Sequence, residues 1–219
     1  LKRGAKVNAR NRYDDTALLL CATVADIKCM ELLIAKGGDV NAKNMLGWSP
    51  LSKTVRYGHL QAIRFLIKQG ATVDIRLNDG ATPLIIAAVE QHSGAVHLLL
   101  QSGADPNAQN LEGTTAILLA TLAGRGDIIR TLVAGGADLK AGNSFSGDLL
   151  FLAVERDLAD SVRVLLELGV SVESRSPRGW TALMRAAKYG RVLSASVLIA
   201  NEADVNGASK NGATPLMIA

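Results

Sequence analysis

Apolar side chains recur at helical spacing in short segments, which glycines and polar residues separate. One segment places four apolar residues at the three-and-four spacing of a single helical face, namely Leu60, Ile63, Leu66 and Ile67. Gly70 follows them, and a residue without Cβ readily takes the left-handed conformation that ends a helix. The pattern therefore predicts an amphipathic helix that starts near Leu60 and stops before Gly70.

A shorter helix is predicted just before this one. The Ser49 hydroxyl can accept a hydrogen bond from a free N–H group of a first helical turn, and Pro50 is tolerated at the first helical position. The helix should run to about Tyr57, where Gly58 stops it. Two helices and an extended loop therefore make one structural unit.

This unit is copied along the whole chain with a period of 33 residues. Good helix-capping residues stand once per period, at Thr16, Ser49, Thr82, Thr115, Asp148, Thr181 and Thr214. An apolar residue follows two positions later, at Leu18, Leu51, Leu84, Ile117, Leu150, Leu183 and Leu216. One glycine series runs Gly47, Gly80, Gly113, Gly179 and Gly212, with Ser146 at the vacant step. A second series runs Gly4, Gly37, Gly70, Gly103, Gly136 and Gly169, with Glu202 at the last step.

The repeated motifs resemble the ankyrin repeat family. The segments that carry the resemblance are DGATPLIIAA at 79–88, NGATPLMIA at 211–219 and GADPNA at 103–108. The resemblance implies an all-α fold, an ankyrin-repeat α-solenoid of stacked helix-turn-helix units joined by β-turn or hairpin loops. We expect a single array over 1–219, with complete repeats at 11–43, 44–76, 77–109, 110–142, 143–175 and 176–208. Partial repeats at 1–10 and 209–219 indicate a fragment of a longer ankyrin repeat protein.

Departures from the family pattern predict local irregularities. Ser146, Gly147 and Asp148 replace the expected Gly-x-Thr, so we expect a distorted loop there. Glu202 stands where glycine would avoid a Cβ clash, so we expect a strained or loosened helix end. The histidine that usually follows the Thr-Pro-Leu motif is replaced mostly by apolar residues, which favours apolar packing between the helices.

Composition excludes several function classes. The longest apolar stretch is far shorter than the roughly 20 residues that a membrane-spanning helix requires, so no membrane insertion is expected. The net charge of +4 is diffuse, which argues against nucleic acid as a partner. Cys21 and Cys29 fall on apolar helical positions, and we interpret them as buried free thiols, although their spacing permits a disulfide. Free thiols and the absence of a visible signal peptide favour a cytoplasmic or nuclear location.

The sequence offers no catalytic, cofactor-binding or metal-binding constellation. His59 and His92 share one step of the repeat and are interpreted as structural, and His97 is expected to be exposed. None of these histidines has metal-ligand spacing to Cys, Asp or Glu. No phosphate-binding or nucleophile-elbow motif occurs. We therefore expect no enzyme and no cofactor within this segment.

Partner contacts are implied by the resemblance to ankyrin arrays, which bind through loop residues and the ends of first helices on a concave face. Trp48 and Trp180 occupy the same repeat position, and each precedes a basic-aromatic pair by eight residues. Tryptophan, tyrosine and arginine dominate binding hot spots. The candidate partner-binding residues are Arg12, Tyr13, Met45, Leu46, Trp48, Arg56, Tyr57, Arg178, Trp180, Lys188 and Tyr189.

The leading hypothesis is a protein–protein interaction scaffold, monomeric as an isolated domain. A second hypothesis is that the array is the targeting or substrate-recruitment arm of a larger enzyme, such as a kinase, a ubiquitin ligase or a hydrolase, with catalysis outside this segment. A third is a structural spacer without a single partner. The tryptophans and tyrosines among the candidate residues could instead pack on a neighbouring loop and bind nothing. The fold alone does not decide between these interpretations, because one fold can carry many functions.

Overall fold

The computed structural model describes residues 6–140 and 148–219. The chain forms two compact units, which divide after Ala116. Every named element in the described ranges is an α-helix, and the β pairing there is restricted to two isolated bridges, Arg10–Thr16 and Arg175–Thr181. Apart from the last one, the helices of the described ranges come in pairs, one short first helix and one longer second helix, as the periodicity predicts.

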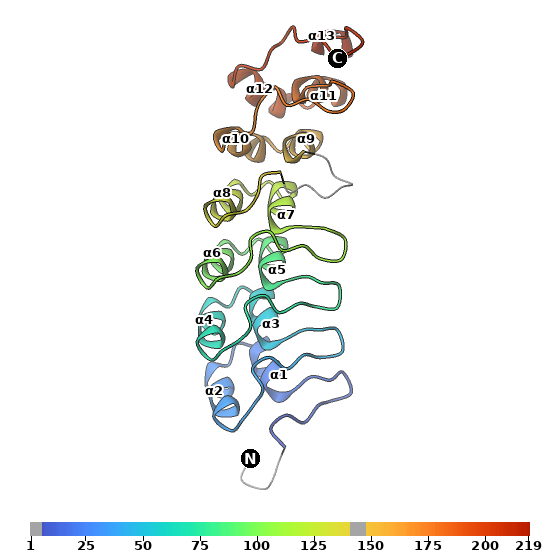
Figure 1. Cartoon of the computed structure of the whole chain (residues 1–219). Helices are drawn as coiled ribbons and strands as arrows, with labels where there is room; N and C mark the ends of the chain where they lie inside the picture. Colours follow the sequence, from blue (N-terminus) through green and yellow to red (C-terminus); the bar gives the residue numbers. More distant parts are fainter. Residues whose placement is uncertain (1–5, 141–147) are drawn as a thin grey trace. The chain divides into compact units, whose positions relative to one another are not determined.

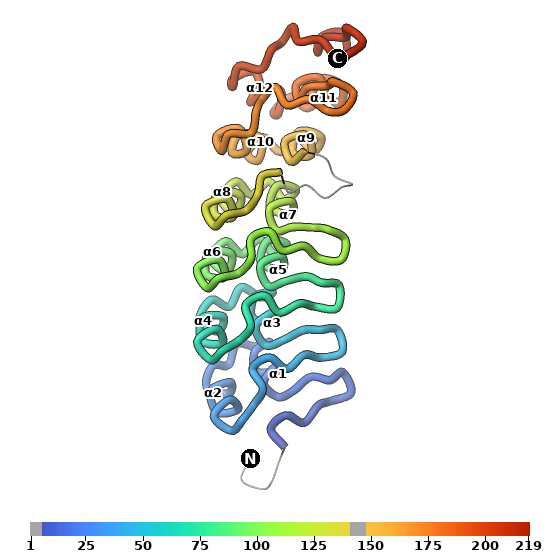
Figure 2. The backbone as a smooth tube through the Cα atoms, viewed as in Figure 1, coloured from blue at the N-terminus to red at the C-terminus, as the bar shows by residue number. Residues whose placement is uncertain are grey.

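Unit 1 contains three complete helix pairs. They are α1 (Ala17–Thr23) with α2 (Ile27–Ala35), α3 (Pro50–Arg56) with α4 (Leu60–Lys68), and α5 (Pro83–Val89) with α6 (Ser93–Gln101). The first helices stack in one layer, with α3 between α1 and α5, and the second helices form another layer (Figure 1). The loops before the first helices project from the side of that first layer as hairpin-like excursions (Figure 2).

Unit 2 holds the remaining helices, apart from the first residue of α7. They are α7 (Ala116–Leu122), α8 (Gly126–Ala134), α9 (Leu149–Glu155), α10 (Ala159–Glu167), α11 (Ala182–Tyr189), α12 (Val192–Ala200) and α13 (Pro215–Ile218). Here α11 packs between α9 and α13, and α10 packs between α8 and α12. The predicted loop distortion at Ser146 and the predicted glycine step at Gly4 lie outside the described residues.

Side-chain caps start the first helices as predicted. Thr16 Oγ1 accepts a hydrogen bond from the Leu19 N–H at 3.3 Å. Thr82 and Thr181 likewise accept from the N–H groups of Ile85 and Met184, each three residues later in the chain. Ser49 accepts from the Ser52 N–H, and the Ser52 hydroxyl accepts from the Ser49 N–H in return, which makes a capping box. Thr214 stands at the N-cap of α13 without a side-chain cap bond.

Left-handed backbone recurs at three steps of the repeat wherever the structure describes those steps. The two glycine series supply most residues at two of these steps, and Asp14 stands one period before Gly47 with a φ of 63°. Glu202 also has a φ of 63°, which is the strained alternative of the two expected at that helix end. The third step lies in the turn between the two helices, where Gly58, Gly124 and Gly190 alternate with non-glycine residues at Ala25, Gln91 and Asp157. Those non-glycine positions were not foreseen, because Ala and Gln do not favour a left-handed conformation, and an Asp, although enriched there, does not mark one by itself.

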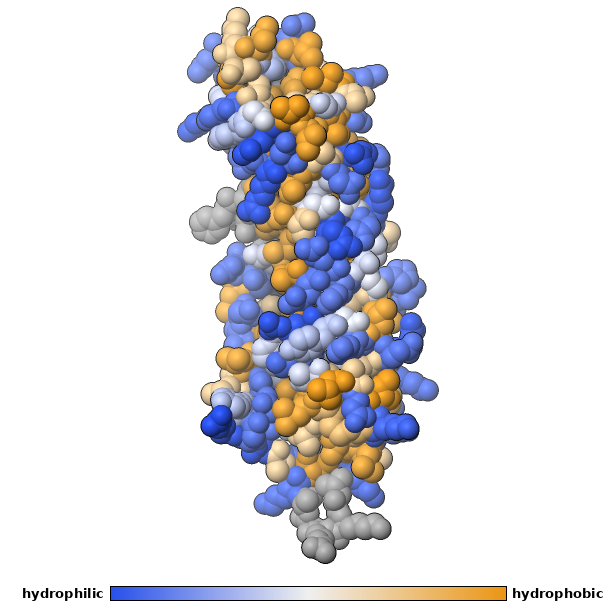
Figure 3. All heavy atoms as spheres, turned by 180° about the vertical axis from the view of Figure 1, so that it is seen from behind, coloured by the Kyte–Doolittle hydropathy of each residue, from blue (hydrophilic) through white to orange (hydrophobic). Residues whose placement is uncertain are grey.

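The apolar step after each cap forms the core of the repeats. Leu18, Leu51, Leu84, Ile117, Leu150 and Leu183 are all buried, whereas Leu216 in the four-residue α13 is 86% exposed. Apolar atoms also gather on the surface around α12 and α13 (Figure 3). Within residues 6–140 and 148–219, no helix combines the length and the apolar character that crossing a membrane demands.

The interpretation of the two cysteines as buried free thiols is wrong. Cys21 in α1 and Cys29 in α2 form a disulfide, with their Cα atoms 6.0 Å apart, and both residues are partly exposed. The physical reason is the tight turn at Ala25, whose φ of 54° folds α2 back on α1 and brings the two side chains together. The argument for a reducing compartment therefore loses its basis in the thiols.

Candidate functional site

The loop tips of unit 1 are joined edge to edge by backbone hydrogen bonds. The Met45 N–H donates to the Tyr13 carbonyl at 3.2 Å, and the Leu111 N–H donates to the Asp79 carbonyl at 2.9 Å. The Asn78 amide side chain adds a bond to the Met45 carbonyl at 2.8 Å. Neighbouring recognition loops therefore hold one another in place.

Asparagine shapes several of these loops locally, at Asn11, Asn44 and Asn110. Asn44 Oδ1 accepts from the N–H groups of both Leu46 and Trp48, and Asn11 does the same for Tyr13 and Asp15. Such side-chain-to-backbone bonds substitute for backbone turn bonds. In unit 2, Ser176 takes this role and accepts from the Trp180 N–H at 3.2 Å.

Gly47 permits the close approach of two loops. Its φ is 82°, and a Cβ built on it would lie 2.7 Å from the Asn78 backbone nitrogen and 2.9 Å from the Leu77 Cα. Real Cβ atoms do not approach backbone so closely, and a left-handed φ strains any L side chain. Gly47 therefore lets the loop that carries Trp48 lie directly against the loop of the next repeat.

Arginines connect consecutive repeats along the backs of these loops. Arg76 donates to the Gly80 carbonyl and to the Gln109 carbonyl one repeat further on, at 3.0 and 2.7 Å. Arg10 and Arg175 repeat the arrangement with Lys43 and Ala208. Sequence reasoning missed this role, although the period relates Arg10 to Arg76.

Four residues at the start and end of α3 form a cluster that we call the Trp48 patch: Trp48, Lys53, Arg56 and Tyr57. The Lys53 ammonium lies 4.8 Å and the Arg56 guanidinium 5.2 Å from the centre of the Trp48 ring. Arg56 also faces Glu90 of the next repeat at 3.7 Å. Tyr57 is 48% exposed.

Burial and the positive charges of the Trp48 patch affect the pKa of Lys53. Partial burial lowers its pKa from the ordinary 10.5, the charge of Arg56 lowers it further, and Asp15 opposes both. Lys53 and Arg56 both make cation–π contacts with the face of the Trp48 indole. Each such contact contributes about 0.5–1 kcal/mol at an exposed site. The half-buried indole is thus covered on one side by the protein's own cations.

The other candidate residues of unit 1 lie at the loop tips. Arg12 stacks over the ring of Tyr13 with its guanidinium carbon 4.6 Å from the ring centre. Tyr13, Met45 and Leu46 are all exposed. These side chains project from loops that the backbone bonds hold rigid, so they form an apolar surface beside the Trp48 patch.

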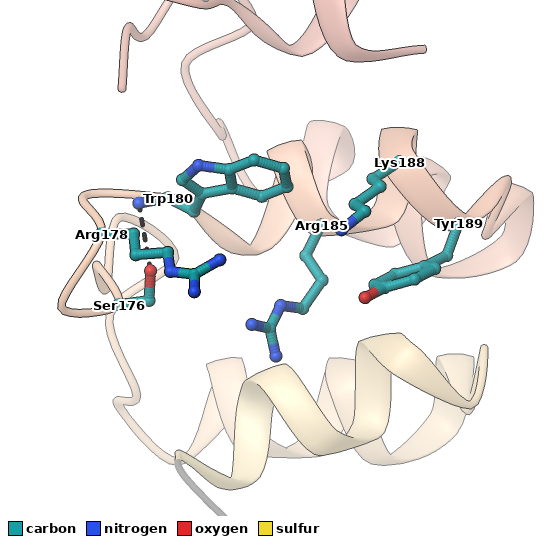
Figure 4. A pocket seen from close by; sticks show the side chains of 6 residues that line it. All are labelled: Ser176, Arg178, Trp180, Arg185, Lys188 and Tyr189. Carbon is teal, nitrogen blue, oxygen red and sulfur yellow. Dashed lines mark hydrogen bonds between the residues drawn. The ribbon is translucent and has the colours of Figure 1, made fainter. Parts of the chain in front are cut away.

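A second cluster surrounds Trp180 in unit 2, and we call it the Trp180 patch: Ser176, Arg178, Trp180, Arg185, Lys188 and Tyr189. These residues line a hollow of about 110 Å³ (Figure 4). The Lys188 ammonium lies 5.3 Å from the Trp180 ring centre and 5.1 Å from that of Tyr189. Arg185 turns instead to α9, where it pairs with Glu155 and lies 5.1 Å from the Phe151 ring centre.

Sequence reasoning therefore found most of each patch and missed Ser176 and two basic residues, Lys53 and Arg185. Lys53 and Arg185 occupy the same repeat position, three residues before Arg56 and Lys188 respectively. Helical residues three apart share a face, so this spacing is the signal that could have found them.

The histidines behave as the sequence indicates. His92 Nε2 lies 3.1 Å from the Arg56 carbonyl oxygen, and its ring fills the space beside Gly58. His97 is exposed on α6. In the part of the chain that the structure describes, no three His, Cys, Asp or Glu side chains gather so that they could hold a metal ion.

Comparison with known proteins identifies the architecture. The family model described as "Ankyrin repeats (3 copies)" matches residues 18–110, 73–143, 94–176 and 149–219. The chain belongs to the ankyrin repeat family. Its fold is that of an ankyrin-repeat α-solenoid, and this confirms the fold class predicted from the period.

Two solved ankyrin repeat domains illustrate the likeness. The ankyrin repeat domain of Bcl-3, described as a unique member of the IkappaB protein family, is 27% identical with a TM-score of 0.81, and the match covers 94% of each chain. The human ASB11 ankyrin repeat domain is 28% identical with a TM-score of 0.76, covering 94% of this chain and 92% of that one. A search of curated proteins returned no match. Ankyrin repeat domains are generally protein–protein interaction modules and are typically non-catalytic.

Proposed function

We propose that this ankyrin repeat chain binds a partner protein through its recognition loops and the ends of its first helices. The observation that carries the proposal is the repetition of one surface arrangement. At Trp48 and again at Trp180, a half-exposed indole lies beside a basic side chain and an exposed tyrosine. Aromatic and basic side chains of this kind supply large contact area at modest entropic cost.

The packing of the loops supports a binding role. The loop-tip side chains are mounted on backbone that neighbouring repeats fix through the Met45 to Tyr13 and Leu111 to Asp79 bonds. A rigid surface loses little conformational entropy when a partner docks, which favours affinity. We extend the proposal to the whole chain as one array of six complete and two partial repeats.

The experiment compares partner capture by two double variants of the full chain. Trp48→Ala with Tyr57→Ala removes the aromatic surface of one patch. Arg64→Ala with His97→Ala is the matched control, because both residues are exposed on the second helices α4 and α6. Affinity purification from cells with quantitative mass spectrometry measures the stoichiometry of retained proteins.

We expect the aromatic variant to lose a stoichiometric partner while its urea unfolding midpoint stays near that of the unaltered chain. The control should retain the partner. If the aromatic variant keeps its partner, or loses it only together with its fold, Trp48 and Tyr57 are packing residues and the proposal fails at this patch.

A further inference from the structure

The hollow beside Trp180 has the size of one side chain. Its volume of about 110 Å³ is well below the roughly 300–1,000 Å³ of a small-molecule pocket. A second shallow hollow of about 240 Å³ is lined by Glu155, Tyr189 and Arg191. Two adjoining hollows that share Tyr189 suit consecutive side chains of an extended peptide.

The hollows are strongly basic. Arg178, Arg185, Lys188 and Arg191 line them, against the single carboxylate of Glu155. That carboxylate is already paired with Arg185. Among the described residues, no carboxylate forms an ion pair with Arg178 or Lys188, and both side chains are exposed. Figure 4 shows the guanidinium groups of Arg178 and Arg185 on one side of the Trp180 ring.

This charge is local. Residues 110–219 carry equal numbers of basic and acidic side chains. A nucleic acid or an anionic membrane requires a basic surface that extends along its phosphates, because the electrostatic contribution grows with the number of contacts. A carboxylate, in contrast, needs only one or two arginines, which can bind it with two parallel hydrogen bonds.

We propose that the Trp180 patch receives an acidic side chain from an extended acidic segment of the partner protein. The carboxylate lies between Arg178 and Lys188, and a neighbouring apolar or aromatic side chain of the segment packs on the Trp180 ring. This inference rests on the proposed function and names the chemistry of the partner at this site.

The test uses the full chain and a short fluorescein-labelled peptide of alternating Glu and Ser residues around one central Tyr. The comparison peptide has Gln in place of every Glu. Fluorescence anisotropy should show that the chain binds the acidic peptide. Its affinity for the Gln peptide should be lower by about tenfold or more. Affinity for the acidic peptide should also fall as salt is raised.

The decisive variant is Arg178→Glu with Lys188→Glu, which should lower the affinity for the acidic peptide by about tenfold or more. The neutral pair Arg178→Gln with Lys188→Gln should give a smaller loss. The matched control is Arg163→Glu with Lys140→Glu, which reverses two exposed charges of unit 2 that line neither hollow, and it should bind within about twofold of the unaltered chain. Circular dichroism of each variant confirms folding.

Three outcomes would overturn the inference. They are equal binding of the Glu and Gln peptides, unchanged affinity in the Arg178→Glu, Lys188→Glu variant, and binding of oligo-dT or phosphatidylserine vesicles in place of the acidic peptide. Partner capture by the same charge-reversed variant separates the two proposals. If capture persists unchanged, the acidic specificity is wrong and the protein-binding proposal stands.

Discussion

The Trp48 patch and the Trp180 patch are separated by four repeat lengths in the sequence and have nearly the same residues, yet their surfaces differ. At Trp48, both Lys53 and Arg56 lie over the indole. At Trp180, only Lys188 does so, because Arg185, the counterpart of Lys53, turns to Glu155. The first indole is covered by the protein's own cations, and the second borders an open hollow.

The preceding repeat decides which arrangement forms. Glu155 and Phe151 of α9 attract Arg185 through charge and through the ring face. The same two repeat positions ahead of Lys53 hold Thr23 and Leu19, which offer neither a carboxylate nor an aromatic ring. A binding surface in this chain is therefore a property of two neighbouring repeats, and not of one.

The largest expected effect concerns the loops that carry the two tryptophans. Gly47→Ala should lower the free energy of unfolding by about 2–3 kcal/mol, because the new Cβ meets backbone atoms of the next loop. Gly179→Ala should cost about 1–2 kcal/mol, because the closest atom there is the flexible Lys210 Cγ at 2.8 Å, although the Lys210 nitrogen follows at 3.1 Å. Urea unfolding of both variants measures the difference, and equal losses would show that the two loops are held equally tightly.

The next effect concerns the ion pair that distinguishes the patches. Glu155→Gln should cost about 0.5 kcal/mol of stability, since the pair with Arg185 is about one third exposed. It should also raise affinity for the acidic peptide about twofold to threefold, because it removes the carboxylate that competes with the peptide for Arg185 in the lining of the hollow. Glu90→Gln is the control in the Trp48 patch, where the pair is looser and should contribute almost nothing. A weaker peptide affinity in Glu155→Gln would contradict the account.

The smallest effect is a change of protonation. Thr23→Glu places a carboxylate at the position equivalent to Glu155 and should raise the pKa of Lys53, which burial and Arg56 now lower. Because the pKa of Lys53 is lower in the folded chain than in the unfolded chain, the unfolded chain binds more protons between the folded-state pKa and 10.5. The free energy of unfolding therefore rises with pH over that range. The substitution should flatten this rise. NMR titration of the Lys53 Cε resonance gives the answer, and an unchanged pKa would show that Lys53 stays on Trp48.

The repeat period made most of the fold predictable. Each described first helix begins after its predicted cap, and Glu202 adopts the left-handed conformation expected of a glycine step. These features are local, because they depend on a few adjacent residues and on their phase in the period. The same phase placed Trp48 and Trp180 at equivalent positions.

Features that depend on contacts between helices could not be predicted in this way. The Cys21–Cys29 disulfide depends on the turn at Ala25, a residue type that does not mark left-handed backbone. The different directions of Lys53 and Arg185 depend on residues thirty positions earlier in the chain. Sequence periodicity shows that two positions are equivalent, but the residues of the neighbouring repeat determine which contacts each side chain makes.

The most direct test of the binding account is hydroxyl-radical footprinting of the chain with its copurified partner, compared with the chain alone. Aromatic side chains report strongly in this method, and both patches expose tyrosine. The account predicts protection of Tyr57 and Tyr189, with His97 on α6 unchanged. Protection of His97 with full reactivity at both tyrosines would place the partner on the second helices and contradict the account.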